Sequence, residues 1–118
     1  MHEMGIAMQI IEIAVASIPA ELKNVQVKRV NLKVGKLAAV VPESLHFCFQ
    51  IAAQNTPLCD ADLNIEQIPV KIRCENCNIE WTVNEPVFMC RRCNGGSIKM
   101  LSGRELDITS IEVVDKDA

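Results

Sequence analysis

Four of the six cysteines form two Cys-x-x-Cys pairs with twelve residues between them. Each pair can turn two thiolates toward one point about 2.3 Å from a metal, and a hairpin between the pairs would bring the four sulfurs together. Sites closed by four thiolates usually hold structure rather than perform catalysis. The spacing therefore predicts one structural Zn(II), bound by Cys74, Cys77, Cys90 and Cys93.

The turns that carry such pairs favour a residue that can adopt a positive φ angle just after the second cysteine. Gly95 and Gly96 follow the second pair closely, whereas Asn78 follows the first pair. We therefore expect glycine to provide this backbone freedom in the second turn.

A further group of potential metal ligands is Met1-His2-Glu3. Initiator methionine is normally removed only before a small residue, so we expect Met1 to remain. The Met1 amine, the His2 backbone nitrogen and the His2 imidazole could then close adjacent chelate rings, with the Glu3 backbone nitrogen or carboxylate nearby. Planar, nitrogen-rich coordination of this kind suits Ni(II) or Cu(II). The residues alone leave open that His2 is an exposed side chain without a ligand.

The composition is that of a folded protein, because 49% of the 118 residues are hydrophobic and 23% are charged. A net charge of -3 argues against a protein built mainly to bind nucleic acid. The apolar stretch from Met4 to Ile18 contains Gln9 and Glu12 and is too short to cross a bilayer. Without an export signal we expect the reducing cytoplasm, where paired cysteines bind metals rather than form disulfides.

Two helices are expected to support these groups. The first ends near Pro19, and its apolar stripe comprises Met4, Ala7, Met8, Ile11, Ala14, Val15 and Ile18. The second begins around Pro42, because proline is favoured in the first helical turn, and ends at Asn55-Thr56-Pro57. Its predicted buried residues are Leu45, Cys48, Phe49 and Ala52.

Alternating β-branched and aliphatic residues predict three strands. The first covers Val25 to Leu37, is broken at Gly35, and places Val30, Leu32 and Val34 on one face. Residues 61–69 and 104–114 alternate in the same way on the two sides of the cysteine segment. We expect these two strands to pair with each other, so that residues 70–103 protrude as an inserted module.

The predicted fold is therefore α+β: a small mixed sheet of about three strands with two helices, plus an inserted four-cysteine zinc-ribbon module. Residues 1–69 and 104–118 would form the α+β domain that carries the Met1-His2-Glu3 group. Residues 70–103 would form the zinc-binding domain.

Five motifs follow one another along the chain: Met-His-Glu at the start, an amphipathic helix, Val-x-Leu-x-Val-Gly-x-Leu at 30–37, Pro-Glu-Ser-Leu-x-Phe-x-Phe at 42–49, and the two cysteine pairs. In this order they resemble the HypA/HybF family of hydrogenase nickel-incorporation proteins. The resemblance covers nearly the whole chain.

The resemblance implies a cytoplasmic nickel metallochaperone, not an enzyme. His2 would be the essential Ni(II) ligand, supported by Glu3 and the Met1 amine, while the four cysteines would hold structural zinc. The implied partners are a HypB-like hydrogenase-maturation GTPase, the large subunit of NiFe-hydrogenase and, for some members, a urease accessory protein. The α+β domain would then be the nickel-binding domain.

Two other function classes fit the sequence less well. A zinc-ribbon module that binds nucleic acid or protein would reuse the four cysteines, but residues 70–104 hold only six basic residues against three acidic ones. Four thiolates with Zn(II) carry a net negative charge and would reduce this positive excess further. Little positive charge then remains to bind the phosphates of a nucleic acid. A redox dithiol would need one pair at a helix start rather than two facing pairs.

Three remaining side chains carry weaker expectations. His46 should lie on the exposed side of the second helix, Cys48 should be a small core residue, and Cys59 should be an exposed thiol without an assigned role. A homodimer stays open, because an inserted module joined by two strands could exchange between chains.

Overall fold

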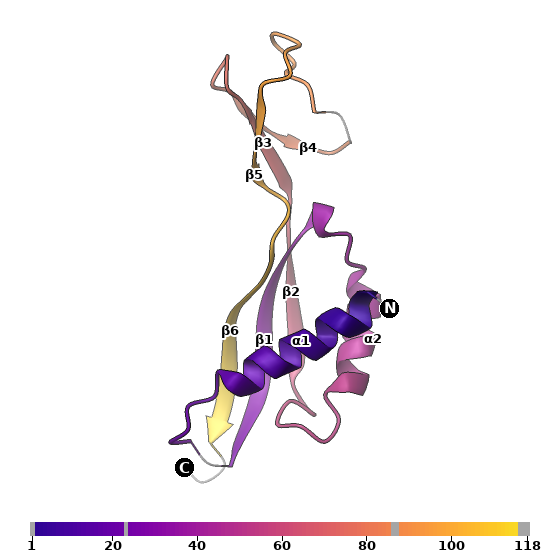
Figure 1. Ribbon diagram of the computed structural model, residues 1–118, viewed down its shortest axis with the longest axis vertical. Coiled ribbons are helices and arrows are strands. Elements are labelled where there is room, and N and C mark those ends of the chain that lie inside the picture. Colours follow the sequence, from indigo (N-terminus) through magenta and orange to yellow (C-terminus); the bar gives the residue numbers. More distant parts are fainter. Residues whose placement is uncertain (1, 23, 86–87, 116–118) are drawn as a thin grey trace. The chain divides into compact units, whose positions relative to one another are not determined.

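The computed structural model describes residues 2–22, 24–85 and 88–115. In chain order its elements are α1 (His2–Ala16), β1 (Val25–Gly35), the 3₁₀ turn η1 (Lys36–Ala38), α2 (Pro42–Ala52), β2 (Asp62–Ile68), β3 (Val70–Cys74), β4 (Glu80–Val83), β5 (Ile98–Ser102) and β6 (Leu106–Asp115) (Figure 1). Two helices with small sheets confirm the predicted α+β class. No described helix is both long and apolar enough to cross a membrane.

The chain divides into two compact units, and each of them is discontinuous in sequence. The first, which we call the helical unit, consists of Met1–Lys33, Val40–Glu66 and Asp107–Ala118. The second, the cysteine unit, consists of Val34–Ala39 and Gln67–Leu106. Residues 34–39 therefore group with the cysteine segment, although they lie between β1 and α2 in the sequence.

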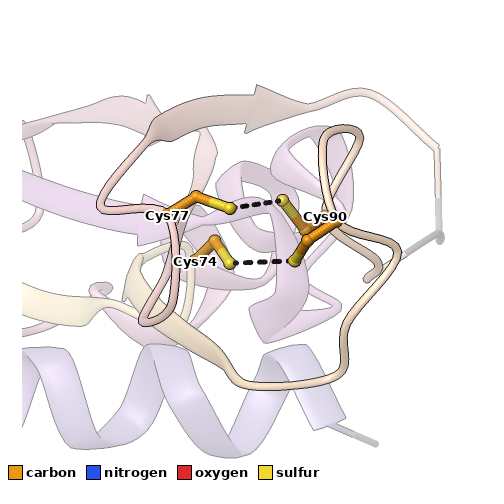
Figure 2. Close-up of side chains that lie close together, drawn as sticks. Cys74, Cys77 and Cys90 are labelled. Atoms are coloured by element: carbon orange, nitrogen blue, oxygen red, sulfur yellow. Dashed lines mark hydrogen bonds between the residues drawn. The ribbon is translucent and has the colours of Figure 1, made fainter.

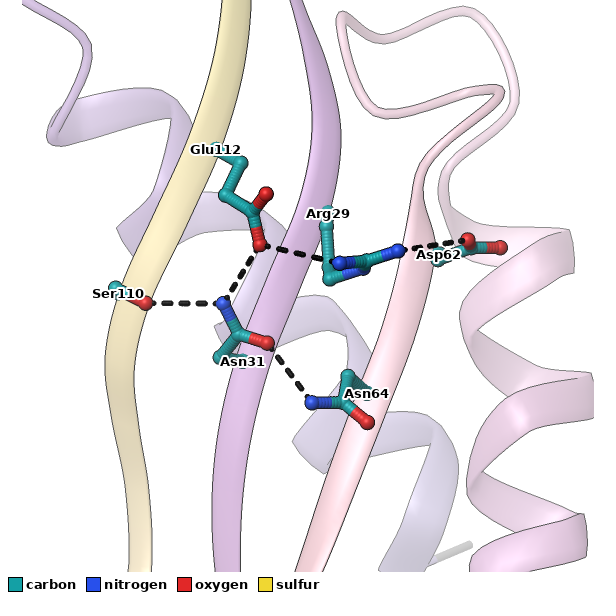
Figure 3. A network of polar contacts seen from close by, with 6 residues as sticks. All are labelled: Arg29, Asn31, Asp62, Asn64, Ser110 and Glu112. Atoms are coloured by element: carbon teal, nitrogen blue, oxygen red, sulfur yellow. Dashed lines mark hydrogen bonds and ion pairs between the residues drawn. The ribbon is translucent and has the colours of Figure 1, made fainter.

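The sheet that extends through the helical unit has the strand order β2-β1-β6. Side-chain contacts reveal the strand directions, and they join Arg29 to Asp62, Asn31 to Asn64, Arg29 to Glu112, and Asn31 to Ser110 (Figure 3). From Arg29 to Asn31 on β1, the partner residue advances from Asp62 to Asn64 on β2 but goes back from Glu112 to Ser110 on β6. β1 therefore runs parallel to β2 and antiparallel to β6, which makes the sheet mixed.

The predicted pairing of residues 61–69 with 104–114 is wrong, because β1 lies between these two strands. They do share one sheet. β1 has more buried aliphatic side chains than either neighbour, namely Val27, Val30, Leu32 and Val34. A strand that must bury this much apolar surface is more stable in the centre of a sheet than at its edge.

The buried face of α1 is rotated from the predicted one. Ala7, Ile11 and Ala14 are buried as expected, but Ile6 and Ile10 complete the face, whereas Met8 is 59% exposed and Val15 is 41% exposed. Aliphatic residues flank the central row on both sides, so periodicity alone did not distinguish the two flanks. After Ala16 the helix is closed by Ser17, whose backbone N–H and hydroxyl both donate to the Ile13 carbonyl oxygen.

α2 begins at Pro42, as predicted, and packs against α1. Leu45, Cys48 and Phe49 are buried as expected, and Ala53 is buried in place of the half-buried Ala52. Figure 1 shows α1 crossing one face of the sheet, and Figure 3 shows polar side chains on the opposite face. The apolar core of the helical unit thus lies between its helices and a single face of the sheet.

The cysteine unit has its own antiparallel sheet, with strand order β4-β3-β5. The central strand pairs Ile72 with Trp81 of β4, and Cys74 with Ile98 of β5. Among the described residues of this unit, the buried apolar side chains are Val34, Val70, Ile72, Cys74 and Cys90. So few buried aliphatic residues form a very small core.

Candidate metal centre

Both Cys-x-x-Cys turns end in an asparagine with a left-handed backbone. Asn78 has φ 56° and Asn94 has φ 55°. Their N–H groups donate to the carbonyl oxygens of Cys74 and Cys90, at 2.8 and 2.9 Å. Asparagine tolerates this conformation because its short polar side chain can hydrogen-bond locally. The expectation that glycine would provide positive φ in the second turn is wrong, although the repeated Cys-x-x-Cys-Asn pattern was visible in the sequence.

The two turns bring their four sulfur atoms together. The Sγ atoms of Cys74 and Cys93 are 3.7 Å apart, those of Cys77 and Cys90 are 4.0 Å apart, and all four lie within 4.8 Å of one another. Figure 2 shows Cys74 and Cys77 facing the turn that carries Cys90. Four sulfurs placed about 2.3 Å from a tetrahedral centre would be about 3.8 Å apart. The cluster therefore fits one tetrahedral metal ion.

Backbone N–H groups point at two of these sulfurs. The N–H of Arg92 donates to Cys90 Sγ and that of Gly95 donates to Cys93 Sγ, both at 3.4 Å. A Cβ atom at Gly95 would lie 3.1 Å from Cys93 Sγ, so glycine allows the backbone to approach this sulfur. Such donors stabilise the thiolate form that a metal binds.

The local environment shifts the pKa values of Cys90 and Cys77 in opposite directions. The backbone N–H of Cys93, followed by that of Arg92, stabilises the Cys90 thiolate and lowers the pKa of Cys90 to about 6. The pKa of Cys77 is raised to about 12, first by its side-chain hydrogen bond with Cys93 and then by burial. A cation that binds all four sulfurs as thiolates must therefore displace the proton of Cys77 at neutral pH.

The other two cysteines lie outside this cluster. Cys48 is 2% exposed in α2, which confirms its assignment to the core, and Cys59 is exposed in the turns before β2. Within residues 2–22, 24–85 and 88–115, the four clustered cysteines form the one group of three or more His, Cys, Asp or Glu side chains placed to share a metal.

His2 and Glu3 form the first turn of α1. The His2 side chain is exposed, and Glu3 is half-buried near the positive end of the helix dipole, where a carboxylate is stabilised. In the described part of the chain, no third His, Cys, Asp or Glu side chain joins them as a potential ligand. The amine of Met1, which the sequence also suggests as a ligand, lies outside the described residues.

His46 is exposed on α2, as expected, and lines an open hollow of about 450 Å³. Arg29, Gln50, Asp62 and Asn64 also line this hollow. Asp62 and Arg29 already form an ion pair at 4.0 Å. His46 thus lies among polar side chains, and among the described residues it belongs to no group of potential metal ligands.

Comparison with known proteins gives a consistent family. The family model described as "Hydrogenase/urease nickel incorporation, metallochaperone, hypA" matches residues 1–113. Over 113 residues the chain is 58% identical to the hydrogenase maturation factor HypA of Desulfosudis oleivorans, and the match covers 96% of this chain and 98% of that protein. It is 51% identical over 117 residues to HypA of Desulfatibacillum aliphaticivorans, covering 99% and 90%.

Two solved structures share the fold. The solution structure of the Ni metallochaperone HypA from Helicobacter pylori matches with a TM-score of 0.65 at 17% identity, covering 97% of this chain and 98% of that one. A second solution structure of a HypA protein matches with a TM-score of 0.62 at 19% identity, covering 96% and 93%.

Proposed function

Because the chain belongs to the HypA family of nickel-incorporation metallochaperones of hydrogenase maturation, we propose that it binds Ni(II) at His2 and Glu3 and delivers the ion to the large subunit of NiFe-hydrogenase. The observation that supports this site best is the exposed position of His2 at the start of α1. The first four amides of a helix have no intrahelical acceptor. The backbone nitrogens of His2 and Glu3 can therefore bind a metal without loss of a helical hydrogen bond.

Such a site suits an ion that must be released again. One imidazole, local backbone nitrogens and the Met1 amine leave Ni(II) open to ligand exchange, and nitrogen-rich coordination suits this metal. These nitrogens must lose protons to bind, so acid should release nickel. Nickel affinity that stays constant between mildly acidic and neutral pH would contradict this ligand set.

The four cysteines hold Zn(II) in the same proposal, and this zinc stabilises structure. The sulfur spacing fits a closed tetrahedral site, which leaves no open coordination position for substrate. Residues 1–69 and 104–118 then serve as the nickel-binding domain, and residues 70–103 serve as the zinc-binding domain. The protein itself catalyses no reaction.

Delivery requires partners that the family description suggests in outline. A HypB-like GTPase would supply the energy-dependent step, and the NiFe-hydrogenase large subunit would receive the ion in the cytoplasm. Because that description reads "Hydrogenase/urease", a urease accessory protein is a second candidate recipient. Pull-down with the purified candidate, in the presence and absence of nickel, distinguishes the two recipients.

The decisive test is a nickel titration of zinc-loaded protein whose chain starts at Met1 without a tag. We expect one strongly bound Ni(II), which is lost in His2→Ala and in a version extended by several residues before Met1. Because the chain contains two histidines, His46→Ala is the matched control and should bind nickel like the parent. Zinc content should remain one per chain throughout.

Equal nickel binding by all four proteins would show that His2 is not a ligand. The nickel proposal would then fail at its central residue, and the cysteine unit as a binding module would become the better explanation.

A further inference from the structure

A backbone clasp connects the end of β1 to the segment between β5 and β6, within the cysteine unit. The N–H of Gly35 donates to the Glu105 carbonyl oxygen at 2.7 Å, and the N–H of Leu37 donates to the Gly103 carbonyl oxygen at 2.8 Å. The Glu105 carboxylate accepts a further bond from the N–H of Gly103, also at 2.7 Å. Two hydrogen bonds thus hold residues 35–37 against residues 103–105, and the third stabilises the turn at residues 103–105 itself.

The clasp depends on direct contact between two glycine backbones. A Cβ atom at Gly35 would lie 2.1 Å from the carbonyl carbon and oxygen of Gly103. Gly103 itself has φ +124°, and its Cβ would lie 2.9 Å from Cγ2 of Val70. Side chains at either position would therefore force the two segments apart or strain the backbone.

The clasp rests on the strand that carries the first metal-site cysteine. Val70 is the buried first residue of β3, and Cys74 is the last. β5, which leads directly to Gly103, pairs with β3 from Lys71 to Cys74, with a register shift between Lys71 and Ile72. Because the cysteine unit buries few aliphatic side chains, a metal at the far end of this strand pair would contribute much of the stability of the pair.

We propose that the clasp makes the order of residues 35–37 depend on the metal in the four-cysteine site. The segment between β1 and α2 is then a conformational reporter of that site, although it lies far from the cysteines in the sequence. This inference rests on the structural zinc of the proposed function and is independent of where nickel binds.

Hydrogen exchange resolved by NMR tests the coupling, with zinc-loaded and chelator-stripped full-length protein. Without zinc, the amides of Gly35 and Leu37 should exchange on the order of tenfold faster or more, together with those of β3 and β5. The amides of residues 28–33 should keep their protection. If Gly35 and Leu37 stay protected while β3 and β5 lose protection, the coupling is overturned. If β3 and β5 stay protected, zinc does not order these strands. That result would contradict the structural role of zinc, and it would overturn the coupling as well.

Substitutions at two glycines distinguish the effect of the clasp from the effect of the zinc. Gly103→Ala should retain one zinc per chain but lose protection at Gly35 and Leu37. Gly96→Ala is the matched control, because a Cβ there meets no atom within 4 Å, and it should change neither property. Equal protection in the two variants would overturn the proposal.

Glu105→Ala is a milder probe, useful if Gly103→Ala does not fold. It removes the carboxylate acceptor of the Gly103 N–H and adds no steric conflict. It should increase exchange at Leu37 more than at residues 28–33, and no difference between these amides would also overturn the proposal.

Discussion

The helical unit and the cysteine unit of this chain are stabilised by different means. The helical unit buries aliphatic and aromatic side chains from both helices and from the sheet, whereas the cysteine unit buries few and gathers four thiols instead. Their charges differ as well: the cysteine unit has seven Lys and Arg against four Asp and Glu, and the rest of the chain has five against eleven. A unit with a substantial core should fold without metal, whereas a unit with so small a core should not.

Removing one sulfur should give the largest difference between the units. Structural zinc contributes about 10–16 kcal/mol to small zinc-binding peptides, so Cys74→Ser should unfold the cysteine unit. NMR should then show that amides of β3–β5 lose dispersion while those of α1 and α2 keep it. Cys59→Ser, which changes an exposed cysteine outside the cluster, should leave both units intact. Loss of α1 and α2 in Cys74→Ser would break the comparison.

Removing a core aromatic should affect the helical unit alone. Phe49 is 2% exposed and Phe47 is 64% exposed in the same helix. Phe49→Ala should lower the free energy of unfolding by about 3–5 kcal/mol, and Phe47→Ala should change it by about 0.5 kcal/mol or less. Urea unfolding followed by helical circular dichroism measures both. Zinc content should not change, and equal effects of the two substitutions would contradict the placement of α2.

A smaller effect is expected on the polar face of the sheet. The Asn31 side-chain NH₂ donates to Ser110 Oγ at 3.0 Å and to Glu112 Oε2 at 3.1 Å, while its carbonyl oxygen accepts from Asn64 at 2.9 Å (Figure 3). Asn31→Ala should destabilise the helical unit by about 1 kcal/mol. The loss is small because water replaces these hydrogen bonds when the protein unfolds. Lys33→Ala, an exposed change on the same strand, should be nearly neutral in the same urea assay. Comparable losses in both variants would show that the network adds nothing specific.

The smallest effect concerns protons released by zinc. Without metal the cysteine unit should unfold, so its four thiols should have ordinary pKa values of about 8.5 and stay protonated between pH 5 and pH 7.5. Zinc must then displace about four protons at both pH values, and its affinity should decrease as the pH falls. Calorimetric titration in buffers of different ionisation enthalpy measures the release. In the folded cluster the pKa of Cys90 is about 6, so a release about one proton smaller at pH 7.5 than at pH 5 would show that the cysteine unit stays folded without metal, contrary to the comparison.

Local signals in the sequence were sufficient for most elements but not for their arrangement. Proline at the start of α2 and Gly35 at the end of β1 act within a few residues, and the structure confirms both predictions. The central place of β1 could not be deduced, because strand order depends on competition between segments far apart in the chain. The face of α1 was ambiguous for a related reason: only its partners decide which apolar flank is buried.

The candidate metal site was likewise predictable only where the signals in the sequence are local. Short-range spacing groups the four cysteines that the structure brings together, and the asparagine after each pair is a further local signal of the turn. The contact between Gly35 and Gly103 has no local signature, because it joins residues that are far apart in the sequence. The ligand roles of His2 and Glu3 stay predictions, to be decided by nickel titration.

The order of the strands also bears on how fast the chain folds. β6 is the last described strand in the sequence, yet it completes the sheet of the helical unit beside β1, and Asn31 and Ser110 are separated by 79 residues. Closing so long a loop costs chain entropy and slows folding. A cysteine unit that has already bound its metal shortens the disordered part of that loop. We therefore expect this sheet to close faster when zinc-loaded protein refolds than when chelator-stripped protein refolds.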